Sequence, residues 1–322
     1  MATASKQPVP IDFFLMLDQS GSMGTDCNIG STTASKWCRA INAVSAYMSS
    51  PAAAGQAASL QYFDLAGASC VTGAGYDVSE IPMSGNGYVS LPSNAFNSSL
   101  NSHFPSTNSS IEGGIRGITG FTGRAPNRRP GRDTVGILIT DDLPTGCDSN
   151  LTNLSNLLQN HHTNTGIVTL VFGMTAANFA MVETLATGGS APLHPDTVNG
   201  ITDTCGNGNG PCRHWNLGNG NGNVIAEALA SVTRRRLNCR YSLAAPDGGA
   251  FPSSSVSVEW ATDASTPTPI PQVADSTACA DGGWYLATPT PPGFVELCSV
   301  TCGSLQLAVD PTVRVTSSAC EP

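Results

Sequence analysis

The stretch FFLMLDQSGSMGTDC, residues 13–27, changes abruptly from apolar to polar. Its first five residues are all apolar, which is typical of a strand that is buried on both faces of a parallel sheet. Asp18, Ser20 and Ser22 follow at alternate positions, with Gly21 between the two serines. Alternate side chains of an extended segment point to one side, so we expect one carboxylate and two hydroxyls to converge on a small volume.

A second stretch repeats this change further along the chain. TVGILIT, residues 134–140, is an apolar run that ends in Asp141 and Asp142. Around both stretches, short β-rich runs alternate with amphipathic segments, which predicts an α/β fold with a doubly wound, mostly parallel central sheet flanked by helices. We expect strands at 11–17, 59–65, 134–140 and 167–174, a short edge strand at 75–83, and helices at 36–48, 96–104, 111–121, 151–158, 176–189 and 224–232.

The chain of 322 residues is long enough for one large domain and a smaller one. We place the first at residues 9–236. From 237 to 322 the composition shifts to Pro, Ser and Thr with short alternating strands and five cysteines, which predicts a small, disulfide-rich all-β module. The strands expected there are VSVEW, PIPQV, WYLA, FVELC and VRV.

The 11 cysteines are spread along the whole chain without a zinc-finger pattern, which favours disulfides formed in an oxidising compartment. Because the number is odd, one thiol is free, intermolecular or paired outside this sequence. The Asn- and Gly-rich insertion at 205–223 cannot bury a core, so we expect a loop held by a Cys205–Cys212 bridge.

Charge and hydropathy exclude some classes of function. A net charge of -9 does not attract nucleic acid or an anionic membrane. There is no apolar run of about 18 residues that could form a transmembrane segment, and no signal segment opens the sequence. Met1 therefore looks like an added start on a secreted or cell-envelope protein. The arginines of GRAPNRRPGR, residues 123–132, and the His161–His162 pair at a helix end are interpreted as exposed charge and a solvated cap.

Both acidic breaks lie at the carboxyl end of a predicted strand, the edge at which open α/β sheets bind ligands. Carboxylate and hydroxyl oxygens, with no His or Cys among them, select a hard cation such as Mg²⁺, with Ca²⁺ or Mn²⁺ as competitors. Asp141 would add a second charge to Asp18. These oxygens do not surround a metal that takes six ligands, so a position is left for water or for a partner's Asp or Glu.

LDQSGSM and ITDDLP, in this order and strand context, resemble the two acidic loops of the von Willebrand factor A (VWA) domain over residues 9–236. The resemblance implies a Rossmann-like fold with a metal-ion-dependent adhesion site, in which Ser20 and Ser22 coordinate directly and Asp18 and Asp141 act partly through water. The family's further threonine ligand matches Ser109, with Thr107 as the alternative. Asp142 stands where the family usually has glycine, a departure that favours Ca²⁺ or weakens the capture of an acidic ligand.

We therefore expect a non-enzymatic, metal-dependent module that binds a protein through an acidic side chain. Sequences near the C-terminus, such as GGWY and LCSVTC, are similar to secreted or lipid-anchored bacterial proteins of this kind, which leaves open a lipid anchor outside this sequence. Two alternatives stay open: a metal-assisted hydrolase, for which Asp142 is the spare acid, and a structural envelope component. HExxH and GxSxG motifs are both absent from the sequence.

Overall fold

The computed structural model describes residues 10–63, 65, 70–105, 108–141, 143–174, 177–206, 210–235, 240–242, 256–262, 266–287, 294–307 and 311–317. The chain divides into two compact units, one formed by Val9–Ala230 and the other by the chain from Ser231 onward. The division lies within helix α6 (Asn223–Arg235). Each unit is described by itself.

The first unit is built on a six-stranded sheet with the order β3-β2-β1-β4-β5-β6. All neighbouring pairs are parallel except β2 and β3, which are antiparallel. The strands are β1 (Ile11–Asp18), β2 (Ala57–Phe63), β3 (Val89–Ser90), β4 (Asp133–Thr140), β5 (Val168–Gly173) and β6 (Trp215–Asn216).

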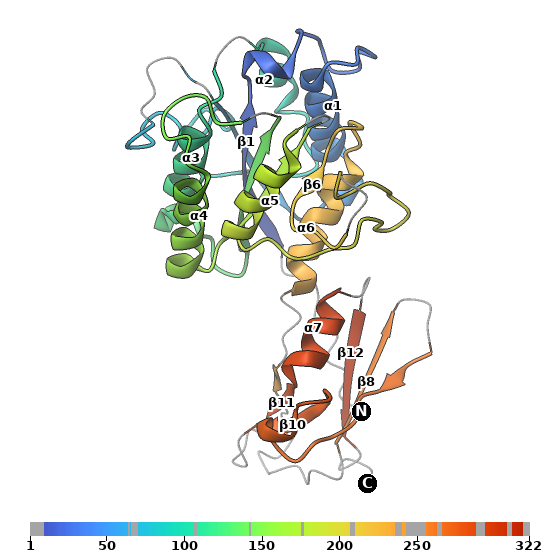
Figure 1. Ribbon diagram of the computed structural model, residues 1–322. Helices are drawn as coiled ribbons and strands as arrows, with labels where there is room; N and C mark the ends of the chain where they lie inside the picture. The colour runs from blue at the N-terminus through green and yellow to red at the C-terminus, as the bar shows by residue number, and fades with distance from the viewer. Residues whose placement is uncertain are drawn as a thin grey trace. The chain divides into compact units, whose positions relative to one another are not determined.

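Helices cover this sheet, with α3 and α4 on one side and α1 and α6 on the other (Figure 1). The predicted α/β fold with a mostly parallel sheet is therefore confirmed. Among the described residues, no helix is both long and apolar enough to cross a membrane. The helices are α1 (Lys36–Ser49), α2 (Asn97–Ser102), α3 (Ile111–Gly123), α4 (Leu151–Thr165), α5 (Phe179–Gly188) and α6, with short 3₁₀ turns at Gly21–Met23, Pro51–Ala53 and Ala125–Asn127.

Strand β1 lies at the centre of the sheet, and all eight of its residues are buried. It pairs with β2 on one side and with β4 on the other, so the order of the strands reverses between β1 and β4. In open α/β sheets this reversal is the switch point beyond whose carboxyl ends ligands bind. Asp18 is the last residue of β1 and Asp141 directly follows β4, so both lie at the switch point.

Helix α3 approaches the sheet closely because glycines lie on its inner face. A Cβ atom on Gly117 would lie 2.5 Å from Met16 Cε and 2.7 Å from the Tyr76 carbonyl oxygen, and one on Gly114 would lie 3.0 Å from the Phe63 ring. Larger side chains at these positions would push the helix away from β1 and β2. The glycines therefore keep the start of α3, and the loop before it, beside the end of β1.

The edge strand expected at residues 75–83 was wrong. Only isolated bridges form there, at Ser79 and Ile81, and the strand that pairs with β2 is the two-residue β3. Pro82 has no N–H to donate to a ladder, and Gly85 and Gly87 adopt positive φ angles that turn the chain.

The basic segment 123–132 is not simply exposed charge. Arg129 Nε lies 2.6 Å from Asp12 Oδ2, and Arg132 Nε lies 2.5 Å from Asp12 Oδ1. The Asp12 side chain is completely buried. A buried carboxylate needs opposite charge or hydrogen bonds, and these two arginines supply both at the start of β1. The interpretation as solvated charge was therefore wrong for Arg129 and Arg132.

The second unit contains two three-stranded antiparallel sheets, with the orders β10-β11-β7 and β12-β8-β9. Its core includes Trp284, Val258, Val295 and Leu305, and a Cys279–Cys298 disulfide crosslinks it. Helix α7 was not expected in an all-β module; it buries Cys302 and Leu305, three residues apart, on one face. The elements are β7 (Arg240–Ser242), β8 (Val256–Thr262), β9 (Thr268–Pro269), a 3₁₀ turn at Ser276–Ala278, β10 (Trp284–Ala287), β11 (Phe294–Leu297), α7 (Ser299–Leu307) and β12 (Pro311–Ser317).

His161 is not part of a solvated cap, because its ring is buried between α4 and α3. Its Nε2 atom lies 2.9 Å from the Thr122 hydroxyl. Burial lowers the pKa of His161 from 6.5 to about 4, and the nearby charges of Arg128 and His162 act in the same direction. The fold therefore favours the neutral ring. The contribution to stability is complete above pH 6.5 and is lost as the pH falls toward 4.

Replacing His161 with Gln should remove this pH dependence. We expect the free energy of unfolding of the wild-type protein to fall between pH 7 and pH 4 by about 2 to 3 kcal/mol more than that of H161Q. Urea unfolding at several pH values measures the difference. The H162Q variant, changed at the next residue of the same helix, should keep most of the wild-type pH dependence, because burial is the main cause of the lowered pKa of His161. Parallel curves for wild type and H161Q would contradict the prediction.

Candidate metal site

The Asp18 carboxylate, at the end of β1, is completely buried, with an exposed fraction of 0%. Its Oδ1 atom accepts a hydrogen bond from the Ser20 backbone N–H at 2.8 Å. Its Oδ2 atom accepts from the Thr140 hydroxyl at 2.7 Å and from the Ser109 hydroxyl at 3.4 Å. Burial raises the pKa of Asp18 to about 6, although the hydrogen bonds from Ser20 and Thr140 oppose the rise; the nearby charge of Asp141 adds to it. Among the described residues, the groups that donate hydrogen bonds to Asp18 are all neutral.

The two serines of the loop and Asp141 form a row of oxygen atoms. Ser20 Oγ lies 2.9 Å from Ser22 Oγ, and the Ser22 hydroxyl donates to Asp141 Oδ1 at 2.9 Å. Ser20 and Asp141 are buried, whereas Ser22 is exposed. The row therefore has a closed inner side, next to Asp18, and an outer side that solvent reaches at Ser22.

The row has the ordinary spacing of hydrogen-bonded oxygens, and the same spacing is compatible with a small divalent cation. Two oxygens at adjacent corners of an octahedron around Mg²⁺ lie about 3 Å apart, because each Mg–O bond is about 2.1 Å long. Both separations along the row equal 2.9 Å. The donor set consists only of carboxylate and hydroxyl oxygens, which suits Mg²⁺, Mn²⁺ or Ca²⁺. The predicted residues Asp18, Ser20, Ser22 and Asp141 are thus brought together in an arrangement that could hold such an ion.

Ser109 also reaches this group, through its contact with Asp18. Its loop is fixed to the segment after Asp141, because the Thr145 N–H donates to the Ser109 carbonyl at 3.0 Å and the Ser109 N–H donates to Thr145 Oγ1 at 3.1 Å. Gly146 packs closely beside them, since a Cβ there would lie 2.8 Å from Ser110 Oγ. The alternative ligand Thr107 and the spare acid Asp142 lie outside the described residues.

Sequence reasoning missed two residues of the site. Thr140 is the last residue of β4, and its hydroxyl orients Asp18; its place directly before the acidic pair is the signal that could have found it. Lys36, the first residue of α1, places its ammonium 2.6 Å from Asp141 Oδ2. The signal for Lys36 is its rarity, since the chain contains only two lysines and this one follows the Asp18 loop.

Disulfides brace both loops that carry the site. Cys27 is joined to Cys38, which connects the loop after Ser22 to the first turn of α1. Cys70 is joined to Cys147, which anchors the loop after Asp141. Crosslinks of this kind limit the conformations that a loop can adopt before it folds. The predicted dependence on disulfides therefore applies to the site as well as to the second unit.

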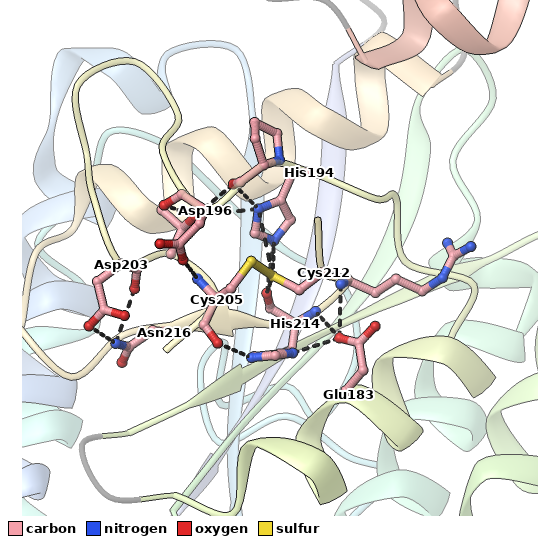
Figure 2. The surroundings of a disulfide bond; sticks show 11 residues. Glu183, His194, Asp196, Asp203, Cys205, Cys212, His214 and Asn216 are labelled. Carbon is pink, nitrogen blue, oxygen red and sulfur yellow. Dashed lines mark hydrogen bonds and ion pairs between the residues drawn. A yellow bond between two sulfur atoms is a disulfide. The ribbon is translucent and has the colours of Figure 1, made fainter. Parts of the chain in front are cut away.

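A separate group of histidines and cysteines lies near β6 (Figure 2). The predicted Cys205–Cys212 disulfide is present. The expectation that residues 205–223 form a loop outside the core was wrong, because the segment contributes strand β6 and the buried side chains of Trp215 and Leu217. His194 stacks on Trp215 with ring centroids 3.6 Å apart. His194, Cys205 and Cys212 lie close enough to share a metal ion. With both sulfurs in a disulfide, however, the group offers one imidazole, which is not enough for a metal site.

The hydrogen bonds around this disulfide instead fix the loop that leads into β6. His214 Nδ1 lies 2.6 Å from Glu183 Oε2 on α5, and its Nε2 lies 2.6 Å from the Cys205 carbonyl (Figure 2). The Glu183 carboxylate also accepts from the backbone N–H groups of Arg213 and His214. These hydrogen bonds lower the pKa of Glu183, although burial opposes the change. The cluster is therefore structural.

Comparisons with known proteins gave structural likenesses alone. No family model and no curated protein sequence matches the chain. Among solved structures, proximal thread matrix protein 1 from the mussel byssus is 12% identical, with a TM-score of 0.39; the match covers 73% of this chain and 49% of that one. A second structure of the same protein, with a zinc-occupied MIDAS motif, is 11% identical with a TM-score of 0.38; the match covers 75% of this chain and 50% of that one. The pilus adhesin SpaC from Lactobacillus rhamnosus GG is 11% identical with a TM-score of 0.41; the match covers 95% of this chain and 39% of that one. This chain thus spans about half the length of the mussel protein, and likeness at this level does not indicate what it binds.

Replacing Thr140 with Val, which has nearly the same shape, should destabilise the protein at the Asp18 carboxylate. The substitution removes the hydroxyl that donates to Asp18 and leaves that carboxylate with fewer donors. We expect the free energy of unfolding in EDTA to fall by about 2 kcal/mol, the usual cost of losing a hydrogen bond to a charged group. Urea unfolding gives the value, and T134V, the same substitution at the other end of β4, is the control. Equal losses in both variants would show that the Asp18 contact has no special role.

Proposed function

We propose that the first unit of this chain is a divalent-cation-dependent protein-binding module, which captures a partner through an acidic side chain. The row of oxygens formed by Ser20, Ser22 and Asp141 is the observation that carries this proposal. It has the spacing of adjacent ligands around Mg²⁺, and it lies at the switch point of the sheet. The sequence resemblance to VWA domains points to the same residues.

Each residue has a distinct part in the proposed site. Ser20, Ser22 and Asp141 would hold the ion on its inner side. Asp18 and Ser109 lie behind them and would complete the negative charge and the hydrogen bonding, with Thr140 orienting Asp18. A bound divalent ion would supply positive charge and an open coordination position next to the exposed Ser22. A carboxylate is the protein ligand that such a hard ion prefers.

The charge of the chain explains why such a module would depend on its metal. A surface with a net charge of -9 repels an acidic partner at long range. Positive charge concentrated at the site would overcome this repulsion locally and would direct the partner's acid to one place. Leu143, two residues after Asp141, is 44% exposed and offers an apolar contact for the protein that carries the acid.

The two alternatives differ from this proposal in what they require. A metal-assisted hydrolase needs a general base, and the acid suggested for this role, Asp142, lies outside the described residues. A structural envelope component would use the ion only to stiffen the fold, so its interactions would not need the open position. We propose binding in preference to both because the outer side of the oxygen row is accessible to solvent.

Metal binding is tested by titrating Mg²⁺, Mn²⁺ and Ca²⁺ into EDTA-treated, dialysed protein in a calorimeter. We expect one ion per chain, a rise in Tm with added metal, and loss of both effects in D141N and S22A. Asp26→Asn, which removes an exposed acid from the same loop as Ser22, is the matched control and should bind normally. Absence of binding by the wild-type protein would overturn the metal dependence.

Ligand chemistry is tested with an array of immobilised peptides in which each Asp or Glu has an Asn or Gln counterpart. We expect capture of the acidic member of a pair in Mg²⁺, and loss of that capture with the amide member, with EDTA or with D141N. The S22A variant should behave like D141N. Capture that survives EDTA would support the structural alternative, and metal-dependent cleavage of a peptide would support the hydrolase.

A further inference from the structure

Lys36 places a positive charge directly on the candidate metal site. Its ammonium lies 2.6 Å from Asp141 Oδ2, while Asp141 Oδ1 accepts from the Ser22 hydroxyl. The Asp141 side chain is completely buried, and the Lys36 side chain is 27% exposed. The two oxygens of one carboxylate thus face two different partners, the ammonium and the oxygen row.

The position of Lys36 in the chain is unusual for a cation. It is the first residue of α1, where the helix dipole disfavours positive charge. Asp141 compensates for this, because a buried carboxylate needs an opposite charge nearby. The other acid of the site, Asp18, is hydrogen-bonded by Ser20, Thr140 and Ser109, which are neutral. The Lys36 ammonium therefore supplies Asp141 with positive charge that a bound metal ion could otherwise supply.

We propose that Lys36 is a tethered cation that neutralises Asp141 in the metal-free protein and competes with the divalent ion for this carboxylate. The inference rests on the proposed metal site and deepens it, since it concerns how the site is regulated. An ion held at Asp141 Oδ1 and the ammonium at Oδ2 of the same carboxylate would repel each other, so binding of the ion would weaken the Lys36–Asp141 ion pair and favour release of the ammonium. The flexible, partly exposed lysine side chain can move its ammonium into solvent when this happens.

This competition has two consequences. Lys36 stabilises the metal-free protein, because it keeps a buried carboxylate paired. It also weakens binding of the divalent ion, because part of the binding free energy is used to break the ion pair. The concentration of free ion at which the site fills is therefore higher than the oxygen ligands alone would set. These two effects are linked and must change together when the lysine is replaced.

The test compares wild type with K36M, K36R and R39M. Lys36→Met keeps the length of the side chain and removes its charge, and Lys36→Arg keeps the charge. Arg39→Met removes one positive charge from the same helix, three residues after Lys36, where the guanidinium donates to the Gly218 carbonyl at 2.6 Å. Calorimetric titration with Mg²⁺ and Mn²⁺ gives the affinities. Thermal unfolding in EDTA and in saturating metal gives the stabilities of the two states.

We expect K36M to bind the ions about tenfold more tightly than wild type, within the usual range for coupled binding events. In EDTA its Tm should be about 3 °C lower, because Asp141 has lost its partner, and saturating metal should remove this deficit. The K36R affinity should equal or fall below that of wild type, and the R39M affinity should stay within about twofold of it.

Each outcome separates this inference from the function on which it rests. If wild type binds metal and K36M binds it no more tightly, the competition is refuted while the metal site stands. If K36M binds and wild type does not, Lys36 blocks the ion completely, so the competition stands and the metal-dependent function falls. If none of the four proteins binds an ion, both fall. If R39M gains as much affinity as K36M, the gain comes from the change in net charge alone, and the competition is refuted.

Discussion

The desolvated carboxylate of Asp18 is the constraint on which the rest of the site depends. A charge buried at the end of the central strand is costly unless several donors reach it, and three do so from different segments: Ser20 from its own loop, Thr140 from β4 and Ser109 from the loop before α3. Satisfying one carboxylate thus draws three segments to a single point. The other oxygens of the site follow from this convergence.

The fold supports this convergence through close packing and crosslinks. The glycines of α3 let the helix lie against β1, which keeps Ser109 within reach of Asp18. The two loops at the strand ends contain few residues that pack in a core, and each is fixed by a disulfide, Cys27–Cys38 and Cys70–Cys147. A site on loops needs such support, because ligand atoms must be held to within a fraction of an ångström to bind a metal selectively.

Sequence patterns predicted the parts of this structure that depend on local periodicity. The apolar runs that end at Asp18 and Asp141 gave the two central strands, and alternation in the loop placed Ser20 and Ser22 on one side. Ion pairs between residues far apart in the sequence were harder to predict from such patterns. Asp12 with its arginines and Lys36 with Asp141 each join residues more than a hundred positions apart, and composition alone made the arginines look exposed. Helix α7 was missed because Cys-, Ser- and Thr-rich composition in a short module favours strands.

The candidate metal site is organised by hydrogen bonds among its own side chains, and this would determine how an ion enters the proposed site. Ser22 Oγ lies 2.9 Å from both Ser20 Oγ and Asp141 Oδ1, as adjacent ligands would, so binding of an ion would require hydroxyl rotation more than movement of the backbone. If Lys36 competes with the ion as proposed, the main obstacle to binding is electrostatic and lies at Asp141, which is paired with the Lys36 ammonium. A site whose ligand atoms are already in place but whose charge is neutralised would respond mainly to the concentration and the charge of the ion, because binding would require little further folding.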